Sequence, residues 1–144
     1  MGMFESKGAF DYFIEKDKFD RIVIVAKMNG CRYEISRSLQ KTFDKVSGNG
    51  DSSFIFDPFY RTCELVPDTI IGKATCSISD EFDVEKGKAI ARARVLEKYY
   101  YFKTKVFDDY SEKMSKIADA FAGASNFSAN KFDIYYNKNN AGEW

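Results

Sequence analysis

The sequence contains no histidine among its 144 residues. Histidine is the commonest general base near neutral pH and a common metal ligand, so its absence removes the usual starting point for catalysis. An enzyme of this composition would have to rely on carboxylates with a metal ion, or on Tyr and Arg. We therefore predict a binding protein rather than an enzyme, with no catalytic residues, no metal and no cofactor.

Cysteine is scarce as well, and its three positions, Cys31, Cys63 and Cys76, are widely spaced. No CxxC pair is present, which excludes a zinc ribbon of the common type. An odd number of cysteines far apart in sequence is typical of reduced, partly buried thiols in a cytosolic protein. We expect all three thiols to be free.

Net charge is also lacking, because 22 basic residues balance 22 acidic ones. A neutral chain has no general attraction for polyanions or for membrane surfaces. No apolar run approaches the roughly 20 residues of a membrane span, and residues 1–10 lack the apolar segment of a signal peptide. We expect no membrane partner and a cytoplasmic location.

What the sequence does contain is aromatic residues, with 14 Phe and 9 Tyr. Together with the aliphatic residues they supply enough apolar surface for one core in a chain of this length. We therefore predict a single α+β domain over residues 1–144. Its antiparallel sheet, at about residues 4–79, packs against one long C-terminal helix.

The clearest strand is residues 21–27, which are rich in β-branched side chains. Asn29 and Gly30 follow and tolerate the positive φ of a type I′ turn, so residues 31–36 are predicted as the second strand of a hairpin. The apolar cluster at residues 10–14 predicts another strand.

Residues 38–77 are predicted to form several short elements. Residues 38–46 predict a short helix with Leu39, Phe43 and Val46 on one face. The composition of residues 47–53 predicts a loop. Short strands are expected at 54–56, 62–66 and 69–77, the last of which completes the sheet.

Helical periodicity begins after residue 83. Residues 84–122 predict one long helix, or two helices broken near Asp108, with Gly123 as a natural stop. The tail 123–144 is polar, and its residues 132–136 suit a strand or a short helix. The helix carries two apolar stripes: Ala89, Ala93, Leu96, Tyr100, Phe107, Met114 and Ala118, and Val95, Tyr99, Phe102, Val106, Tyr110 and Ile117.

One of these stripes is enough to cover a sheet. The second requires cover from the tail or from another copy of the chain, so a homo-oligomer is possible, with Phe102 and Val106 at the contact.

The acidic segment 80–85 lies where the sheet region gives way to the helix. Its carboxylates suit a metal site, but they also suit a helix N-terminus, where a side-chain oxygen accepts hydrogen bonds from free backbone N–H groups. The helix-start interpretation is the stronger. We predict that Asp83 caps the helix and that Phe82 is buried at the joint.

A basic run follows, with seven Lys or Arg and one acid, Glu97, between residues 86 and 105. Three consecutive tyrosines lie within it. Basic side chains interleaved with aromatic rings suit phosphate contact and base stacking. The same pattern also describes a solvated helix face, where long basic side chains cover apolar surface. The candidate ligand- or partner-binding residues are Lys88, Arg92, Arg94, Lys98, Tyr99 and Tyr101.

Residues 72–94 resemble a motif of small proteins encoded by bacteriophages and prophages of low-GC bacteria. The matching residues are Ala74, Cys76, Asp80, Phe82, Asp83, Gly87, Ala91 and Arg92. The resemblance implies a phage accessory protein. Such a protein would antagonise a bacterial defence system by binding a host defence protein or by sequestering its nucleotide signal.

The same joint also looks like the last strand and final helix of a double-stranded-RNA-binding domain, with Lys86, Lys88 and Arg92 at the basic helix start. This likeness implies the alternative function, a nucleic-acid-binding module that uses the basic helix 86–105.

Overall fold

The structure is a computed structural model that describes residues 2–47, 65–77 and 79–141. The chain divides into two compact units, Met1–Phe107 and Asp108–Trp144, which we describe separately. The first unit contains a sheet, helix α1 and the first part of helix α4. The second unit contains the remainder of α4.

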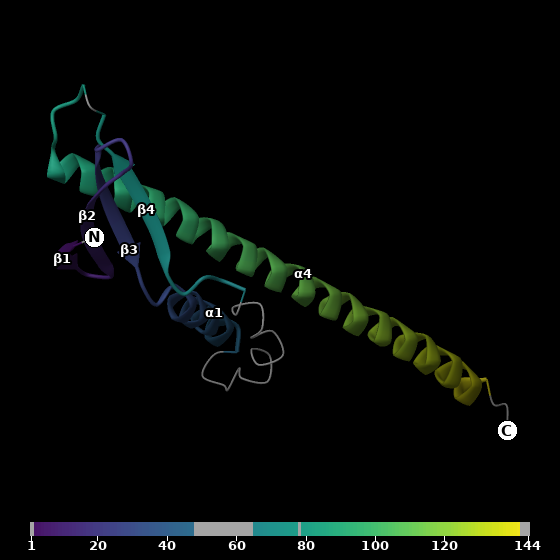
Figure 1. Ribbon diagram of the computed structural model, residues 1–144. Helices are drawn as coiled ribbons and strands as arrows, with labels where there is room; N and C mark the ends of the chain where they lie inside the picture. Colours follow the sequence, from purple (N-terminus) through teal and green to yellow (C-terminus); the bar gives the residue numbers. More distant parts are fainter. Residues whose placement is uncertain (1, 48–64, 78, 142–144) are drawn as a thin grey trace. The chain divides into compact units, whose positions relative to one another are not determined.

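Four antiparallel strands form the sheet in the order β1-β2-β3-β4 (Figure 1). The strands are β1 (Gly2–Lys7), β2 (Phe10–Lys16), β3 (Ile22–Met28) and β4 (Ile70–Thr75). Strands β1 and β4 are therefore the two edges. The α+β architecture is confirmed, as are the strands predicted around residues 10–14, 21–27 and 69–77.

Strand β3 forms the centre of the core. Its consecutive residues Val23, Ile24, Val25 and Ala26 are all buried. Because successive side chains of a strand point to opposite faces, β3 is covered on both faces. A run of β-branched residues suits such a strand better than strict alternation with polar residues.

Helix α4 (Val84–Asn140) packs closely against the sheet at two positions where a glycine provides the space. A Cβ atom added at Gly72 of β4 would overlap the carbonyl oxygen of Ala91 and lie 2.8 Å from the backbone nitrogen of Val95. A Cβ atom added at Gly87 would lie 2.8 Å from Cγ1 of Ile24. The absent side chains therefore allow the helix backbone to approach the sheet closely.

The helix face that packs inward belongs to the stripe predicted as a possible interface. Ala91, Val95 and Tyr99 are buried at four-residue intervals, and Val106 is buried as well. The prediction that Val106 contacts another copy is therefore wrong, since the chain itself covers this side chain. Ala89, Ala93 and Tyr100 of the other stripe are exposed.

The predicted hairpin after Gly30 is also wrong, because residues 31–36 begin helix α1 (Cys31–Ser47). Gly30 does adopt a positive φ of 72°, but the chain then turns into a helix. Cys31, Ile35, Leu39 and Phe43 are buried, whereas Tyr33 is exposed. A strand would place positions 31, 33 and 35 on one face, whereas a helix separates position 33 from the other two. The predicted helix at 38–46 is confirmed as the second half of α1.

Several predictions for the middle of the chain lie outside the described residues. These are the loop at 47–53 apart from Ser47, which ends α1, the strand at 54–56, most of the strand at 62–66 and the thiol of Cys63. Residues 65 and 66 form a turn rather than a strand. Cys31 is buried and Cys76 is partly exposed, and both thiols are free.

Helix α4 does not end at Gly123. It continues without a break past Asp108 and as far as Asn140, so residues 132–136 are helical. Glycine inside a helix costs only about 1 kcal/mol relative to alanine. Alanines at 118, 120, 122 and 124 surround Gly123 and favour the helical state. The second unit is therefore a helix through its described residues, with a short turn at 141.

None of the helices in the described ranges combines the length and apolar character needed to cross a bilayer.

Candidate functional site

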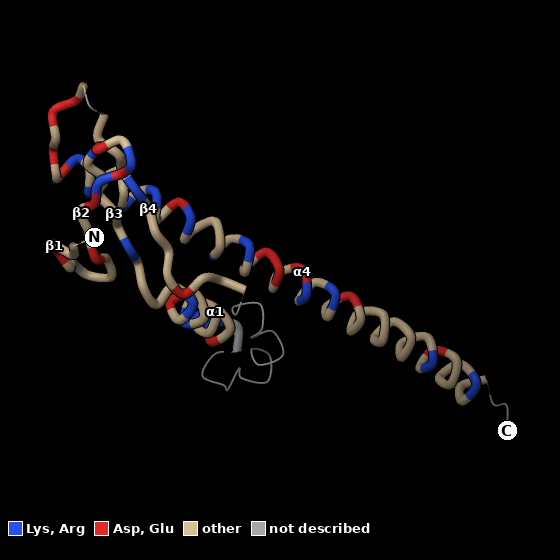
Figure 2. The backbone as a smooth tube through the Cα atoms, viewed as in Figure 1, with Lys and Arg blue, Asp and Glu red and all other residues tan. Residues whose placement is uncertain are grey.

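The basic residues of α4 divide between two sides of the first unit. Figure 2 shows blue and red segments interspersed along α4. Lys88 and Arg92 are four residues apart and contact the strands on one side. Arg94 and Lys98, also four residues apart, reach the edge strand β4 on the other. A continuous basic track along the helix is therefore not formed.

On the first side, Lys88 holds β1 and β2 to α4. Its side chain is only 12% exposed, and its ammonium group pairs with Glu5 of β1 and, at 3.4 Å, with Glu85. The same nitrogen lies 5.1 Å from the centre of the Tyr12 ring. The hydrogen bond with Glu5 raises the pKa of Lys88 and outweighs the desolvation that lowers it.

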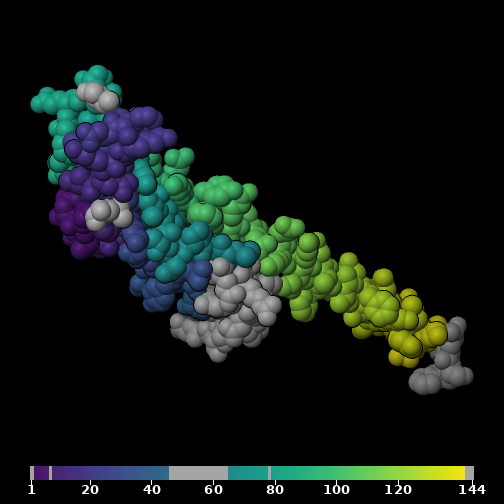
Figure 3. All heavy atoms as spheres, in the orientation of Figure 1, coloured from purple at the N-terminus to yellow at the C-terminus, as the bar shows by residue number. Residues whose placement is uncertain are grey.

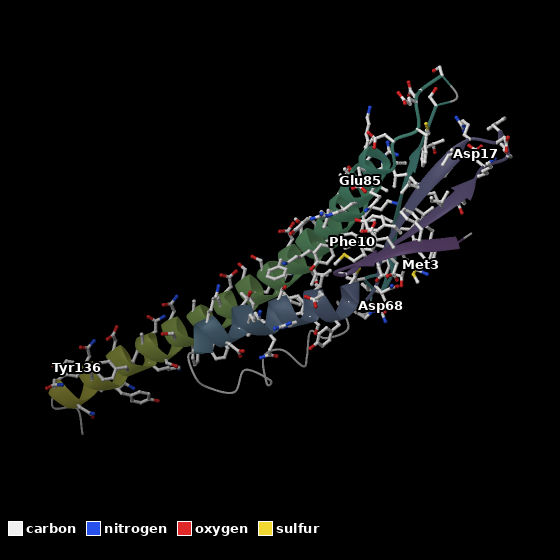
Figure 4. The ribbon with its side chains drawn as sticks, turned by 90° about the vertical axis from the view of Figure 1, so that its left-hand side faces the viewer. Met3, Phe10, Asp17, Asp68, Glu85 and Tyr136 are labelled. Atoms are coloured by element: carbon white, nitrogen blue, oxygen red, sulfur yellow. The ribbon has the colours of Figure 1, made fainter. Side chains whose placement is uncertain are left out.

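Arg92 lies beside Lys88, with its guanidinium carbon 5.5 Å from the centre of the Phe10 ring. Figure 4 labels Phe10 at the sheet below α4. The contact is a cation–π interaction that covers an aromatic ring of β2. Lys88 and Arg92 thus have partners within the fold.

On the second side, two cations bond to the edge of β4. The Arg94 guanidinium donates to the carbonyl oxygen of Lys73, and the Lys98 ammonium donates to the carbonyl oxygen of Ile71 at 2.7 Å. These carbonyls point away from β3, because alternate residues of β4 form the ladder bonds. Figure 3 shows the teal atoms of β4 beside the green atoms of α4.

A groove runs along this edge. Its lining residues are Ile71, Lys73, Arg94, Glu97, Lys98, Tyr101 and Phe102. Tyr101 is 58% exposed, and the Lys105 ammonium lies 5.5 Å from the centre of its ring. Lys73 pairs with Glu15 of β2 at 3.2 Å.

The groove suits an anionic ligand. Arg94 has five N–H donors and Lys98 has three, so each retains donors beyond its bond to β4. Three cations (Lys73, Arg94 and Lys98) and one acid (Glu97) line the groove. Because Lys73 is also paired with Glu15 of β2, the excess of positive charge comes from Arg94 and Lys98. The exposed ring of Tyr101 and the apolar side chains of Ile71 and Phe102 add a surface for a planar or apolar group.

The groove therefore includes three of the six candidate binding residues: Arg94, Lys98 and Tyr101. Tyr99 belongs to the core, where burial and the nearby Glu34 raise the pKa of its hydroxyl. Sequence reasoning missed Ile71, Lys73, Glu97 and Phe102. Nothing in the sequence pointed to Ile71 and Lys73, because only the packing of β4 against α4 brings them next to the basic residues.

The acidic segment 80–85 contains the start of helix α4. The Asp83 carboxylate accepts hydrogen bonds from the backbone N–H groups of Glu85 at 3.1 Å and Lys86 at 3.2 Å, so the predicted cap is confirmed. In the described part of the chain, no three His, Cys, Asp or Glu residues are grouped so that they could hold a metal ion.

The predicted burial of Phe82 is wrong, because its side chain is 38% exposed. A hollow of about 100 Å³, bordered by Phe82, Ile24, Cys76 and Gly87, lies at the joint. Gly87 brings the helix backbone against Ile24, which is buried beneath it, while Phe82 lies at the rim of the hollow.

Comparison with known proteins gives no relative, since no family model, no curated protein and no solved structure matches this chain.

Proposed function

We propose that this chain is a phage-encoded accessory protein that antagonises a bacterial defence system by binding. Its target would be a defence protein or the nucleotide signal that activates it, in the cytoplasm of the host. The observation that supports a binding role is the groove along β4, where cations with spare donors adjoin an exposed aromatic ring. The phage origin and the defence target rest on the motif resemblance.

The chemistry of the groove favours a ligand with a phosphate or carboxylate beside a planar group. An arginine binds such an anion through two parallel N–H donors and also stacks on rings. Arg94 and Lys98 extend from successive turns of one rigid helix, so their spacing is preorganised. A preorganised site loses less entropy when a ligand binds.

The alternative, a nucleic-acid-binding module, has less support. A duplex or a single strand requires several cations along one track. Lys88 is engaged with Glu5 and Glu85, and Arg92 lies over Phe10 on the opposite side from Arg94. Steep salt dependence of binding to duplex or single-stranded RNA or DNA would restore this alternative.

Charge reversal in the groove tests the proposal. We expect the variant Arg94→Glu/Lys98→Glu to bind its ligand at least about tenfold more weakly, because each lost charge-assisted hydrogen bond contributes about 1.5–3 kcal/mol. Binding is measured by calorimetry against cyclic nucleotides. In parallel, host cells carrying a defence system are challenged with phage while they express each variant.

The matched control is Arg92→Glu, which reverses a charge six residues from Lys98 but outside the groove. It should leave binding and phage rescue unchanged. Equal losses in both variants would show that the groove is not the site. Failure of the wild type both to bind nucleotides and to rescue phage against any tested system would overturn the proposed function.

A further inference from the structure

We propose that the groove along β4 selects nucleotides that carry a guanine base, and that Glu97 is the residue that selects the base. The inference rests on the proposed function, because it names the ligand of the same groove. It follows from the unpaired carboxylate of Glu97, from the cations near it and from the aromatic ring one turn further along α4.

The acid, the cations and the ring lie on one face of α4. Arg94, Glu97, Lys98 and Tyr101 are separated by three, one and three residues, and all four line the groove. At 100° per residue their positions fall within about 100° of the helix surface. A ligand that occupies the groove therefore meets a carboxylate as well as the cations and the ring.

The exposed carboxylate of Glu97 has no charged partner in the described part of the chain. Arg94, three residues earlier, is close enough on the helix to pair with it. Its guanidinium bonds instead to the carbonyl oxygen of Lys73, and Lys98 bonds to that of Ile71. Because a carboxylate only accepts hydrogen bonds, Glu97 favours a ligand that donates them.

The donating group of the ligand should be uncharged. An ammonium group would lie beside Arg94 and Lys98, and like charges repel. The edge of a nucleobase supplies uncharged N–H donors on a planar ring. Guanine presents two adjacent donors on its pairing edge, a ring N–H and an amino group, which match the two oxygens of a carboxylate. Adenine and cytosine place an acceptor beside their donor, and that acceptor would face Glu97.

Tyr101 supplies a surface on which the base can stack. Its ring is 58% exposed and meets the ring of Phe102 edge to face, with centroids 5.6 Å apart and planes at 74°. This is a favourable arrangement of two aromatic rings, so the partly buried Phe102 holds the Tyr101 ring in place. Tyr101 follows Glu97 by four residues, which places the stacking surface beside the carboxylate. Arg94 and Lys98 remain for the phosphate.

Base selectivity tests the proposal. Binding of cyclic GMP, cyclic IMP and cyclic AMP is measured by calorimetry, since the three share one phosphate group and differ at the edge of the base. We expect the wild type to bind cyclic GMP at least about tenfold more tightly than cyclic AMP. Cyclic IMP, which lacks the amino group, should lie between them.

The variant Glu97→Gln separates recognition of the base from an effect of charge. A glutamine amide pairs with adenine better than with guanine, so cyclic GMP should bind at least about tenfold more weakly and cyclic AMP no more weakly. A carboxylate that acted only through its charge would give the opposite result, because its removal would strengthen the binding of every nucleotide.

Two further variants complete the test. Tyr101→Ala should weaken the binding of all three nucleotides by at least about fivefold, because each loses its stacking contact. The matched control Glu81→Gln, which neutralises an exposed acid outside the groove, should change none of the affinities. Circular dichroism shows whether each variant remains folded.

Equal affinities of the wild type for the three nucleotides, or stronger binding of all three by Glu97→Gln, would overturn the proposal and leave the groove as a site for anions alone. Absence of nucleotide binding, with phage rescue that still depends on Arg94 and Lys98, would overturn it and leave a defence protein as the target. Absence of both nucleotide binding and phage rescue would overturn the proposed function as well.

Discussion

Two glycines of α4 and β4 have opposite roles, and their substitution by alanine should change stability in opposite directions. Gly72→Ala places a Cβ atom against the backbone of Ala91 and Val95, which cannot move without shifting the helix. Overpacking of this kind costs about 1–3 kcal/mol. We expect a loss in that range for the free energy of unfolding, measured by urea denaturation.

Gly123→Ala is the matched control. An added Cβ atom at Gly123 meets nothing within 4 Å, and the residue lies inside α4. Alanine should therefore increase helix stability by about 0.5–1 kcal/mol, because glycine loses more backbone entropy. A loss of helicity in Gly123→Ala would show that the glycine serves a close contact.

Three titratable side chains of the first unit make its stability sensitive to alkaline pH. Burial raises the pKa of Cys31 and of Tyr99, and the bond with Glu5 raises the pKa of Lys88. A group whose pKa is raised by folding stabilises the fold below its unfolded pKa and loses that contribution as the pH rises through its folded pKa. The ordinary values of these groups are 9.0, 10.0 and 10.5.

We therefore expect the free energy of unfolding of the wild type to change little between about pH 7 and pH 8 and to fall above about pH 9. Tyr99→Phe keeps the buried ring but removes the hydroxyl that ionises, so its stability should fall less steeply above pH 10. Chemical denaturation at a series of pH values measures both slopes. Identical slopes for the two proteins would contradict the assignment to Tyr99.

At the scale of the element, the start of α4 depends on one carboxylate. Asp83→Ala removes the acceptor for the N–H groups of Glu85 and Lys86. The loss of a helix N-cap typically costs about 1 kcal/mol. We expect the melting temperature to decrease, while Asp80→Ala, whose carboxylate caps neither N–H group, leaves it nearly unchanged. A larger decrease for Asp80→Ala than for Asp83→Ala would show that Asp80, not Asp83, caps the helix.

Strands β2, β3 and β4 and the start of α4 were predictable because their signals are local, whereas β1 (Gly2–Lys7) was not predicted. The β-branched run of β3 and the carboxylate before Val84 each act within a few residues. The identity of α1 was not predictable in the same way. Gly30 has the positive φ that the turn required, but this conformation leads equally well into a helix. Tyr33 decides the outcome, because a strand would bury it on the same face as Cys31 and Ile35, whereas a helix turns it outward, where it is 67% exposed.

The end of α4 escaped prediction for a related reason. Gly123 is a common type of helix terminator, but terminators act through a contact with the preceding turn. Surrounding alanines favour continuation at this position. The polar composition of residues 124–140 therefore describes one face of a helix rather than an irregular tail.

At the scale of the whole molecule, only part of the candidate site could be predicted from the sequence. Arg94, Lys98 and Tyr101 follow from the basic, tyrosine-rich run. Ile71 and Lys73 contribute because β4 is an edge strand with its carbonyls turned toward α4. The order of strands in a sheet depends on long-range pairing, which one sequence alone does not specify. The separation of Arg92 from Arg94, by contrast, follows from the helix itself, because residues two apart lie about 200° apart around its axis.

The bonds from Arg94 and Lys98 to the outer carbonyls of β4 also affect how the chain behaves when crowded. An open sheet edge is a template on which other polypeptides add as extra strands, the first step toward amyloid-like aggregates. Here the acceptors that an incoming strand would need at Ile71 and Lys73 are occupied by the protein's own cations. Copies at high concentration would therefore meet a blocked, positively charged edge. The two side-chain bonds thus protect the chain against edge-to-edge aggregation.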